Sequence, residues 1–199
     1  MIALPTRTTY TFAEYLDMTM QLVAEGRTTG PNQSPDYVHY TELSLHRMQR
    51  LAKTTEIIPA LAAAVQGLQK PYQWVVLTEP WCGDAGQNVP VIALAAALNP
   101  EIKLALVLRD DNLDLMDAHL TNGGRAIPKL LVIDPDTQDV VATWGPRPKG
   151  AQDMVMAYKA LEVKPPYSEF VVEVQKWYAK DKTLSMQHEL AEVLSALSK

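Results

Sequence analysis

One stretch of the chain, QWVVLTEPWCGDA at residues 73–85, carries most of the information about the fold. Its first six residues form a short apolar, β-branched run, which is typical of a buried strand. The alanine-rich segment 82–98 that follows has helical character. The stretch therefore predicts a strand that turns directly into a helix, with the chain's one cysteine, Cys82, at the junction.

Outward from this stretch, the middle of the chain alternates between short apolar runs and helical segments. The predicted strands cover residues 73–78, 102–108, 129–133 and 140–144, and the predicted helices cover 82–98, 112–120 and 150–161. This order predicts two parallel strands joined by a helical crossover, then an antiparallel hairpin. The fold class is therefore α/β, with helices on both faces of the sheet.

Both ends of the chain are predicted to add helices. Apolar residues recur at helical spacing over 11–25 and 40–68, and Pro59 is expected to kink or split the second segment. Two further helices follow Pro166. One face of the first carries Phe170, Val174, Trp177 and Tyr178. We expect that face to pack on the core, because an exposed aromatic stripe would be an aggregation or binding patch.

The turn Trp81-Cys82-Gly83 resembles the active-site turn of thioredoxins, where Trp-Cys-Gly-Pro-Cys occupies the same strand-to-helix junction. Three more positions match at the expected separations. They are Pro90, similar to the proline that kinks the helix; Ile127-Pro128, similar to the loop whose cis-proline faces the cysteine; and Gly145, similar to the glycine after the last strand. The resemblance implies a thioredoxin fold, a central mixed β-sheet of about four strands flanked by helices.

We expect a single domain over residues 1–199, since a chain of this length supports one well-buried core. The thioredoxin-like core is expected at about 73–161. An N-terminal helical extension at 10–68 and a C-terminal helical extension at 165–198 are additions to the minimal fold.

Two departures from the family pattern bear on activity. Ala85 stands where thioredoxins have the second, resolving cysteine, and Val76 stands where they bury an acidic residue that assists proton transfer. Attack of a single thiol on a disulfide stops at the mixed disulfide, and release then needs a second thiol from outside. Glu79 and Asp84 are nearby carboxylates that we expect to be solvated and to raise the thiol pKa.

The resemblance makes Cys82 the candidate catalytic residue and implies that Trp81, Gly83, Asp84, Ile127 and Pro128 form the substrate-binding groove. A cysteine at a helix N-terminus gains from the backbone N–H groups and the helix dipole, which lower a thiol pKa. No Lys, Arg or His lies within the turn, although Arg125, Lys129 and Arg147 could approach it in space.

The leading hypothesis is monothiol thiol–disulfide chemistry at an exposed Cys82 with a lowered pKa, an oxidoreductase that lacks the resolving cysteine. Its partners would be protein disulfides or thiols, or a low-molecular-weight thiol such as glutathione. The alternative is a redox-inactive peptide- or protein-binding module that kept the fold and the groove, which Ala85 and Val76 favour. A third possibility is an interaction protein whose extra helices bind the partner. No cofactor or metal is expected, because His39, His46, His119 and His188 are dispersed.

Composition narrows the function classes further. The net charge of −5 gives no electrostatic reason to expect nucleic-acid or anionic-membrane binding. No apolar run approaches the ~20 residues that span a bilayer. Residues 1–10 lack a basic region followed by an apolar core, so no secretory signal is expected. With one cysteine, no intramolecular disulfide can form, and the expected compartment is the cytoplasm.

Overall fold

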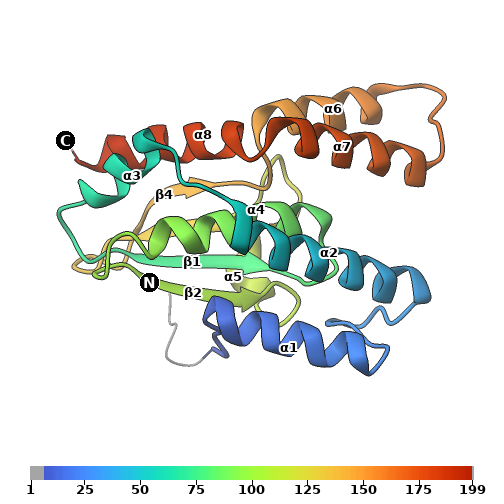
Figure 1. The fold of residues 1–199 in the computed structure, drawn as a ribbon, viewed down its shortest axis with the longest axis horizontal. Coiled ribbons are helices and arrows are strands. Elements are labelled where there is room, and N and C mark those ends of the chain that lie inside the picture. Colours follow the sequence, from blue (N-terminus) through green and yellow to red (C-terminus); the bar gives the residue numbers. More distant parts are fainter. Residues whose placement is uncertain (1–6, 199) are drawn as a thin grey trace.

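The computed structural model describes residues 7–198 and centres on a mixed β-sheet (Figure 1). Its strands are β1 (Gln73–Thr78), β2 (Lys103–Leu108), β3 (Lys129–Ile133) and β4 (Val140–Trp144). Over these residues the sheet has four strands in the order β2-β1-β3-β4. β1 pairs parallel with β2 and antiparallel with β3, and β3 pairs antiparallel with β4. The predicted parallel pair of β1 and β2 and the antiparallel hairpin of β3 and β4 are confirmed, and the antiparallel pairing of β1 with β3 joins them into one sheet.

The two faces of the sheet are buried against different partners. Successive side chains of a strand point to opposite faces, so Trp74 and Val76 join the larger core while Val75 and Leu77 join the smaller one. The larger core holds residues of most of the helices, among them Tyr15, Met48 and Leu190. The smaller core is covered by α5 (Leu113–Asp117) and by Ile127. Full burial on both faces explains why β1 is a nearly continuous apolar run.

The crossover between β1 and β2 is α4 (Gly83–Ala96), which begins directly after Cys82. Pro90 lies inside this helix, as the sequence predicted. α2 (Pro35–Thr54) packs along α4 at close range, because a Cβ atom at Gly86 would lie 3.1 Å from the Cα atom of Ser44. A glycine at this position therefore lets two helix backbones approach each other beside the cysteine.

The N-terminal extension forms three helices. They are α1 (Phe12–Ala24), α2 and α3 (Pro59–Gln66). α1 starts with a capping box in which Thr11 and Glu14 satisfy each other's backbone N–H groups. Pro59 is the first residue of α3, so the predicted segment 40–68 is split rather than kinked. Tyr10 also pairs with Leu106, which covers part of the β2 edge.

After α6 (Lys149–Ala160), the C-terminal extension folds back on the molecule as α7 (Tyr167–Asp181) and α8 (Leu184–Ser195), which a final 3₁₀ turn follows. Figure 1 shows α6 and α7 side by side as a hairpin, and α8 beside α3. Val174 and Tyr178 are buried in a cluster with Ala151. This face of α7 packs inward as predicted, but against α6 in a cluster separate from the main core, where Phe170 and Trp177 are only partly buried.

Within residues 7–198, no helix is both long and apolar enough to cross a membrane. The N-terminal segment for which we expected no secretory signal lies largely outside the described residues.

The predicted α/β fold class is confirmed by this arrangement: a mixed sheet carries helices on both faces, and the helical extensions pack against it. The carboxyl end of β1 and the N-terminus of α4 meet the β3 entry loop and α7, and this is where the candidate site lies.

Candidate functional site

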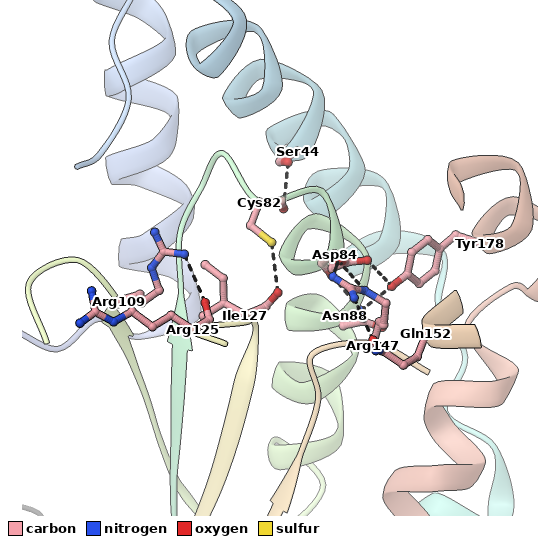
Figure 2. Close-up of polar contacts among 10 residues, drawn as sticks. All are labelled: Ser44, Cys82, Asp84, Asn88, Arg109, Arg125, Ile127, Arg147, Gln152 and Tyr178. Carbon is pink, nitrogen blue, oxygen red and sulfur yellow. Dashed lines mark hydrogen bonds and ion pairs between the residues drawn. The ribbon is translucent and has the colours of Figure 1, made fainter. Parts of the chain in front are cut away.

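Cys82 is held as the N-cap residue of α4, with extended backbone angles of φ −80° and ψ 117°. Three hydrogen bonds fix its backbone. Its N–H donates to the Glu79 carbonyl at 3.0 Å, and its carbonyl accepts from the Gly86 N–H at 3.0 Å and from the Ser44 hydroxyl at 3.2 Å. Figure 2 shows the Ser44 contact arriving from α2. The N-terminal extension therefore holds the cysteine turn in place.

The thiol of Cys82 is oriented toward the loop before β3. Sγ donates to the Ile127 carbonyl at 3.3 Å, and the Ile127–Pro128 peptide bond is cis (Figure 2). Burial of the sulfur, and next the charge of Asp84, raise the pKa of the Cys82 thiol to about 12, against the effect of the Ala85 and Asp84 N–H groups. A carbonyl oxygen facing the sulfur also favours the protonated form, because only a thiol can donate to it.

The expectation of a lowered thiol pKa is therefore wrong in direction. The helix N-terminus does act on Cys82, since N–H groups of α4 reach the sulfur and lower its pKa. Their effect is smaller than the loss of solvation on burial, which penalises the thiolate. The residue as a whole keeps partial exposure toward the cleft described below.

Asp84 lies in a nearly buried network rather than in solvent. Its Oδ2 accepts from Arg147 at 2.6 and 2.9 Å, and its Oδ1 accepts from the Tyr178 hydroxyl at 2.7 Å. The Asp84 and Arg147 side chains are 13% and 16% exposed. Arg147 also donates to Gln152 at 2.8 Å (Figure 2). The expectation that Asp84 is solvated is wrong, because residues far along the chain close over it.

Glu79 is also buried, which corrects the second expectation of a solvated carboxylate. Its Oε1 accepts from the Asp110 N–H at 2.8 Å, and its Oε2 accepts from the Thr29 hydroxyl. Burial raises the pKa of Glu79 to about 7, although both hydrogen bonds oppose the rise. Glu79 thus joins the end of β1 to the loop after α1 and to the loop after β2.

This carboxyl predicts a specific pH dependence of stability. Because the folded-state pKa of Glu79 is about 7 and its ordinary value is 4.5, its contribution is full below pH 4.5 and is lost as pH rises through 7. The difference in unfolding free energy between wild type and Glu79→Gln should therefore change by about 3 kcal/mol over that window, in favour of the variant at higher pH. Urea unfolding of both proteins from pH 4.5 to 8 measures it.

The control for that measurement is Glu192→Gln, which changes an exposed carboxylate on α8. Its difference from wild type in unfolding free energy should not change with pH over the same window. A difference for Glu79→Gln that is also independent of pH would contradict the raised pKa of Glu79.

A cleft of about 340 Å³ opens beside Cys82. Trp81, Cys82, Gly83, Asp84 and Ile127 contribute to its lining, so five of the six sequence-predicted site residues come together there. Pro128 is buried behind the loop and does not line the cleft. Trp81 forms a wall between the Tyr37 ring, 5.1 Å away between centroids, and the Arg109 guanidinium, 4.8 Å from its ring.

The neighbouring loop contains a glycine that the site requires. Gly145 has φ +111°, and a Cβ atom there would lie 2.2 Å from the Pro128 carbonyl oxygen. Only glycine fits this approach. It leads the chain to Arg147 in the cleft. Of the three cations expected to approach Cys82, Arg125 and Arg147 line the cleft, whereas Lys129 points to Thr121 at 3.2 Å.

Several lining residues come from the extensions and were not predicted from the sequence. α2 supplies Tyr37, Tyr40, Leu43 and Arg47, and α7 contributes Tyr167, Phe170, Val171, Val174 and Gln175. Their helical spacing on one face of each helix was the available signal. This spacing indicated that one face of each helix is packed, but not which part of the protein that face contacts.

Among residues 7–198, no cluster of three or more His, Cys, Asp or Glu side chains is arranged to hold a metal ion. The polar groups that face the cleft are arginines, one carboxylate that is already paired, a glutamine, tyrosines and a thiol. This set is suited to hydrogen bonding with an organic ligand or a peptide.

A family model described as thioredoxin matches residues 30–160, which is most of the chain. The chain belongs to the thioredoxin family. The match begins at the loop before α2, so this thioredoxin-family protein shares with its relatives two of the helices that the sequence alone placed outside the core. α7 and α8 lie beyond the match.

Solved structures extend the likeness in fold to nearly the whole chain. A protein of unknown function from Pseudomonas aeruginosa is 20% identical, with a TM-score of 0.54 over 94% of this chain and 98% of that one. An HIV epitope scaffold is 18% identical, with a TM-score of 0.52 over 94% of this chain and 99% of that one. No curated protein matches the chain. The fold of nearly the whole chain therefore recurs in these two solved structures.

Proposed function

We propose that this thioredoxin-family protein is a ligand-binding module that uses the cleft over Cys82 and keeps the thiol protonated in its resting state. The observation that carries the proposal is the thiol donating to the Ile127 carbonyl, with burial raising its pKa to about 12. Disulfide exchange requires a thiolate. The site is thus arranged for binding rather than for nucleophilic attack.

The composition of the cleft supports the same function. Small-molecule sites are mostly apolar concavities of ~300–1,000 Å³ with a few well-placed polar groups. The cleft of about 340 Å³ lies at the lower end of this range and combines aromatic walls with arginines. Ala85 and Val76 stand in place of the groups with which the family completes disulfide reduction, and neither residue lines the cleft.

Monothiol disulfide exchange is the second candidate. Two observations favour it: Cys82 keeps partial exposure in the cleft, and N–H groups of Asp84 and Ala85 point at its sulfur. In this function Cys82 would form mixed disulfides with protein thiols or with a low-molecular-weight thiol such as glutathione, and an outside thiol would release them.

A fragment screen that follows the backbone N–H signal of Gly83, which lines the cleft, by NMR separates the two functions. Ligands found in this way should bind Cys82→Ser within about twofold of wild type, because a serine hydroxyl can also donate to the Ile127 carbonyl. Trp81→Ala should weaken the binding of these ligands at least about tenfold, since the aromatic ring that they stack on is removed. Wild type incubated with oxidised glutathione at pH 7.4 should form little mixed disulfide by mass spectrometry.

Two results would favour the second candidate instead. One is rapid glutathionylation of Cys82 that reduced glutathione reverses. The other is the loss of all cleft ligands in Cys82→Ser.

A further inference from the structure

We infer that the cleft takes a small organic carboxylate with an apolar or aromatic body, and that Arg47 and Gln175 bind the carboxylate. This inference rests on the proposed binding function and names the chemical class of the ligand. The charged side chains that line the cleft are mostly basic, whereas the chain as a whole is acidic.

Arginines dominate the charged lining, although the chain carries a net charge of −5. Within the described residues, the lining holds Arg47, Arg109, Arg125 and Arg147 and one acid, Asp84. Three of these arginines have acidic partners: Arg109 pairs with Asp110 at 2.7 Å, Arg125 with Asp117 at 2.6 Å, and Arg147 with Asp84 at 2.6 Å. These three charges are already compensated by the protein.

Arg47 differs from the other three. Among residues 7–198, its side chain makes no hydrogen bond or ion pair, and it is half-buried on α2. Burial lowers the pKa of Arg47, and the nearby charge of Arg50 lowers it further. Asp84 is the acid that acts on Arg47 from across the cleft, but both of its oxygens already accept hydrogen bonds from Arg147 and Tyr178. A half-buried guanidinium without an acidic partner is stabilised by an anion that binds beside it.

Gln175 on α7 supplies a second unused donor at the same place. Its Oε1 accepts from Gln87 at 2.7 Å, while its Nε2 donates to no acceptor among the described residues. A Cβ atom built on Gly83 would lie 3.2 Å from the Gln175 Nε2 and 3.9 Å from an Arg47 Nη atom. The two donors therefore lie near each other over the backbone of Gly83, whose lack of a side chain lets the Gln175 amide approach.

The side chains around Arg47 and Gln175 indicate the chemistry of the remainder of the ligand. Tyr40, Leu43 and Arg47 follow one face of α2 at helical spacing, and Phe170 and Val174 do so on α7, with Gln175 next to Val174. Apolar side chains of the two helices thus line the cleft beside the two donors. A planar carboxylate fits an arginine fork through two parallel hydrogen bonds, and its apolar body would lie against the aromatic rings.

The test uses phenylacetate, indole-3-acetate and 1-naphthylacetate, each matched with its uncharged arylacetamide. Isothermal titration calorimetry should show at least one acid binding wild type at least tenfold more tightly than its amide. Arg47→Met should weaken that acid by about 10–100-fold, the range expected for charge-assisted hydrogen bonds. The affinity for the matched amide should change less than about twofold. Arg47→Lys keeps the charge but loses the fork of the guanidinium, so its affinity for the acid should lie between those of wild type and Arg47→Met.

Arg50→Met is the matched control, since Arg50 lies on the same helix, is exposed and does not line the cleft. Its affinities for each acid and for the matched amide should lie within about twofold of those of wild type. Equal binding of acid and amide would overturn the inference while leaving the cleft as a binding site. An equal loss of acid and amide in Arg47→Met would overturn it by showing a structural role. Binding of no acid and no amide would overturn it together with the ligand-binding function.

Discussion

Alkylation of Cys82 by iodoacetamide is expected to rise with pH through pH 10 without a plateau near pH 8.5. The thiolate is the reacting species, and an ordinary cysteine titrates near ~8.5. Burial raises the pKa of Cys82 to about 12. At pH 8 the thiolate fraction should then be about a thousandfold smaller than in an unperturbed cysteine, since each pKa unit is a factor of ten.

The chain provides its own control for this measurement because it has one cysteine. The same thiol in guanidinium-unfolded protein should react with an ordinary profile, and the ratio of native to unfolded rates reports the protection directly. A native plateau with an apparent pKa clearly below about 8.5 would contradict the prediction and restore a reactive thiolate. That outcome would move monothiol exchange ahead of ligand binding.

The fold could be predicted in detail from local patterns. β1, β3 and β4 were placed at their observed bounds, and α1, α4, α5 and α6 were placed within a few residues of theirs; α2 was the least accurate at its start, and α7 and α8 were predicted without separate bounds. These elements are fixed by signals a few residues apart, such as the continuous apolar run of the buried strand β1 and Pro59 at the start of α3. The spacing of Trp81-Cys82-Gly83 from Ile127-Pro128 then indicated the family.

The environment of the cysteine could not be predicted in the same way. Asp84 pairs with Arg147, 63 residues away, and with Tyr178, 94 residues away. Glu79 is covered by Thr29 and Asp110, from two different loops. A carboxylate in a turn is usually solvated, and nothing within a few residues of Glu79 or Asp84 signals that distant loops will bury it. Both the burial and the resulting thiol pKa are therefore tertiary effects.

The same reasoning explains why Arg47 and Gln175 were missed. Each lies on a helix whose apolar spacing indicates a packed face, and a polar residue beside such a face usually lies at its solvated edge. Only the meeting of α2 and α7 over Gly83 turns these edges into a site. The two extensions thus contribute the polar groups that make this cleft different from a bare cysteine turn.

Asp84→Ala is expected to lower the unfolding free energy of the protein by about 3 kcal/mol. Removing one member of a buried ion pair leaves the other charge without a partner, which typically costs ~3–5 kcal/mol. Arg147 would be that charge, since its side chain is only 16% exposed. The Tyr178 hydroxyl would also lose its acceptor at 2.7 Å. Urea unfolding at pH 7 measures the difference in unfolding free energy.

Asp117→Ala is the matched control, because Asp117 pairs with Arg125 at 2.6 Å while both side chains are 48% exposed. Exposed ion pairs contribute ~0–1 kcal/mol, so this variant should stay within that range. The double variant Asp84→Ala/Arg147→Ala should be more stable than the sum of the two single changes predicts, since each single variant strands the other charge. Equal, small effects of Asp84→Ala and Asp117→Ala would mean that water reaches the Asp84 pair. The link from the cysteine turn through Asp84 to α7 would then contribute little to stability, and α7 could leave the cleft at low cost.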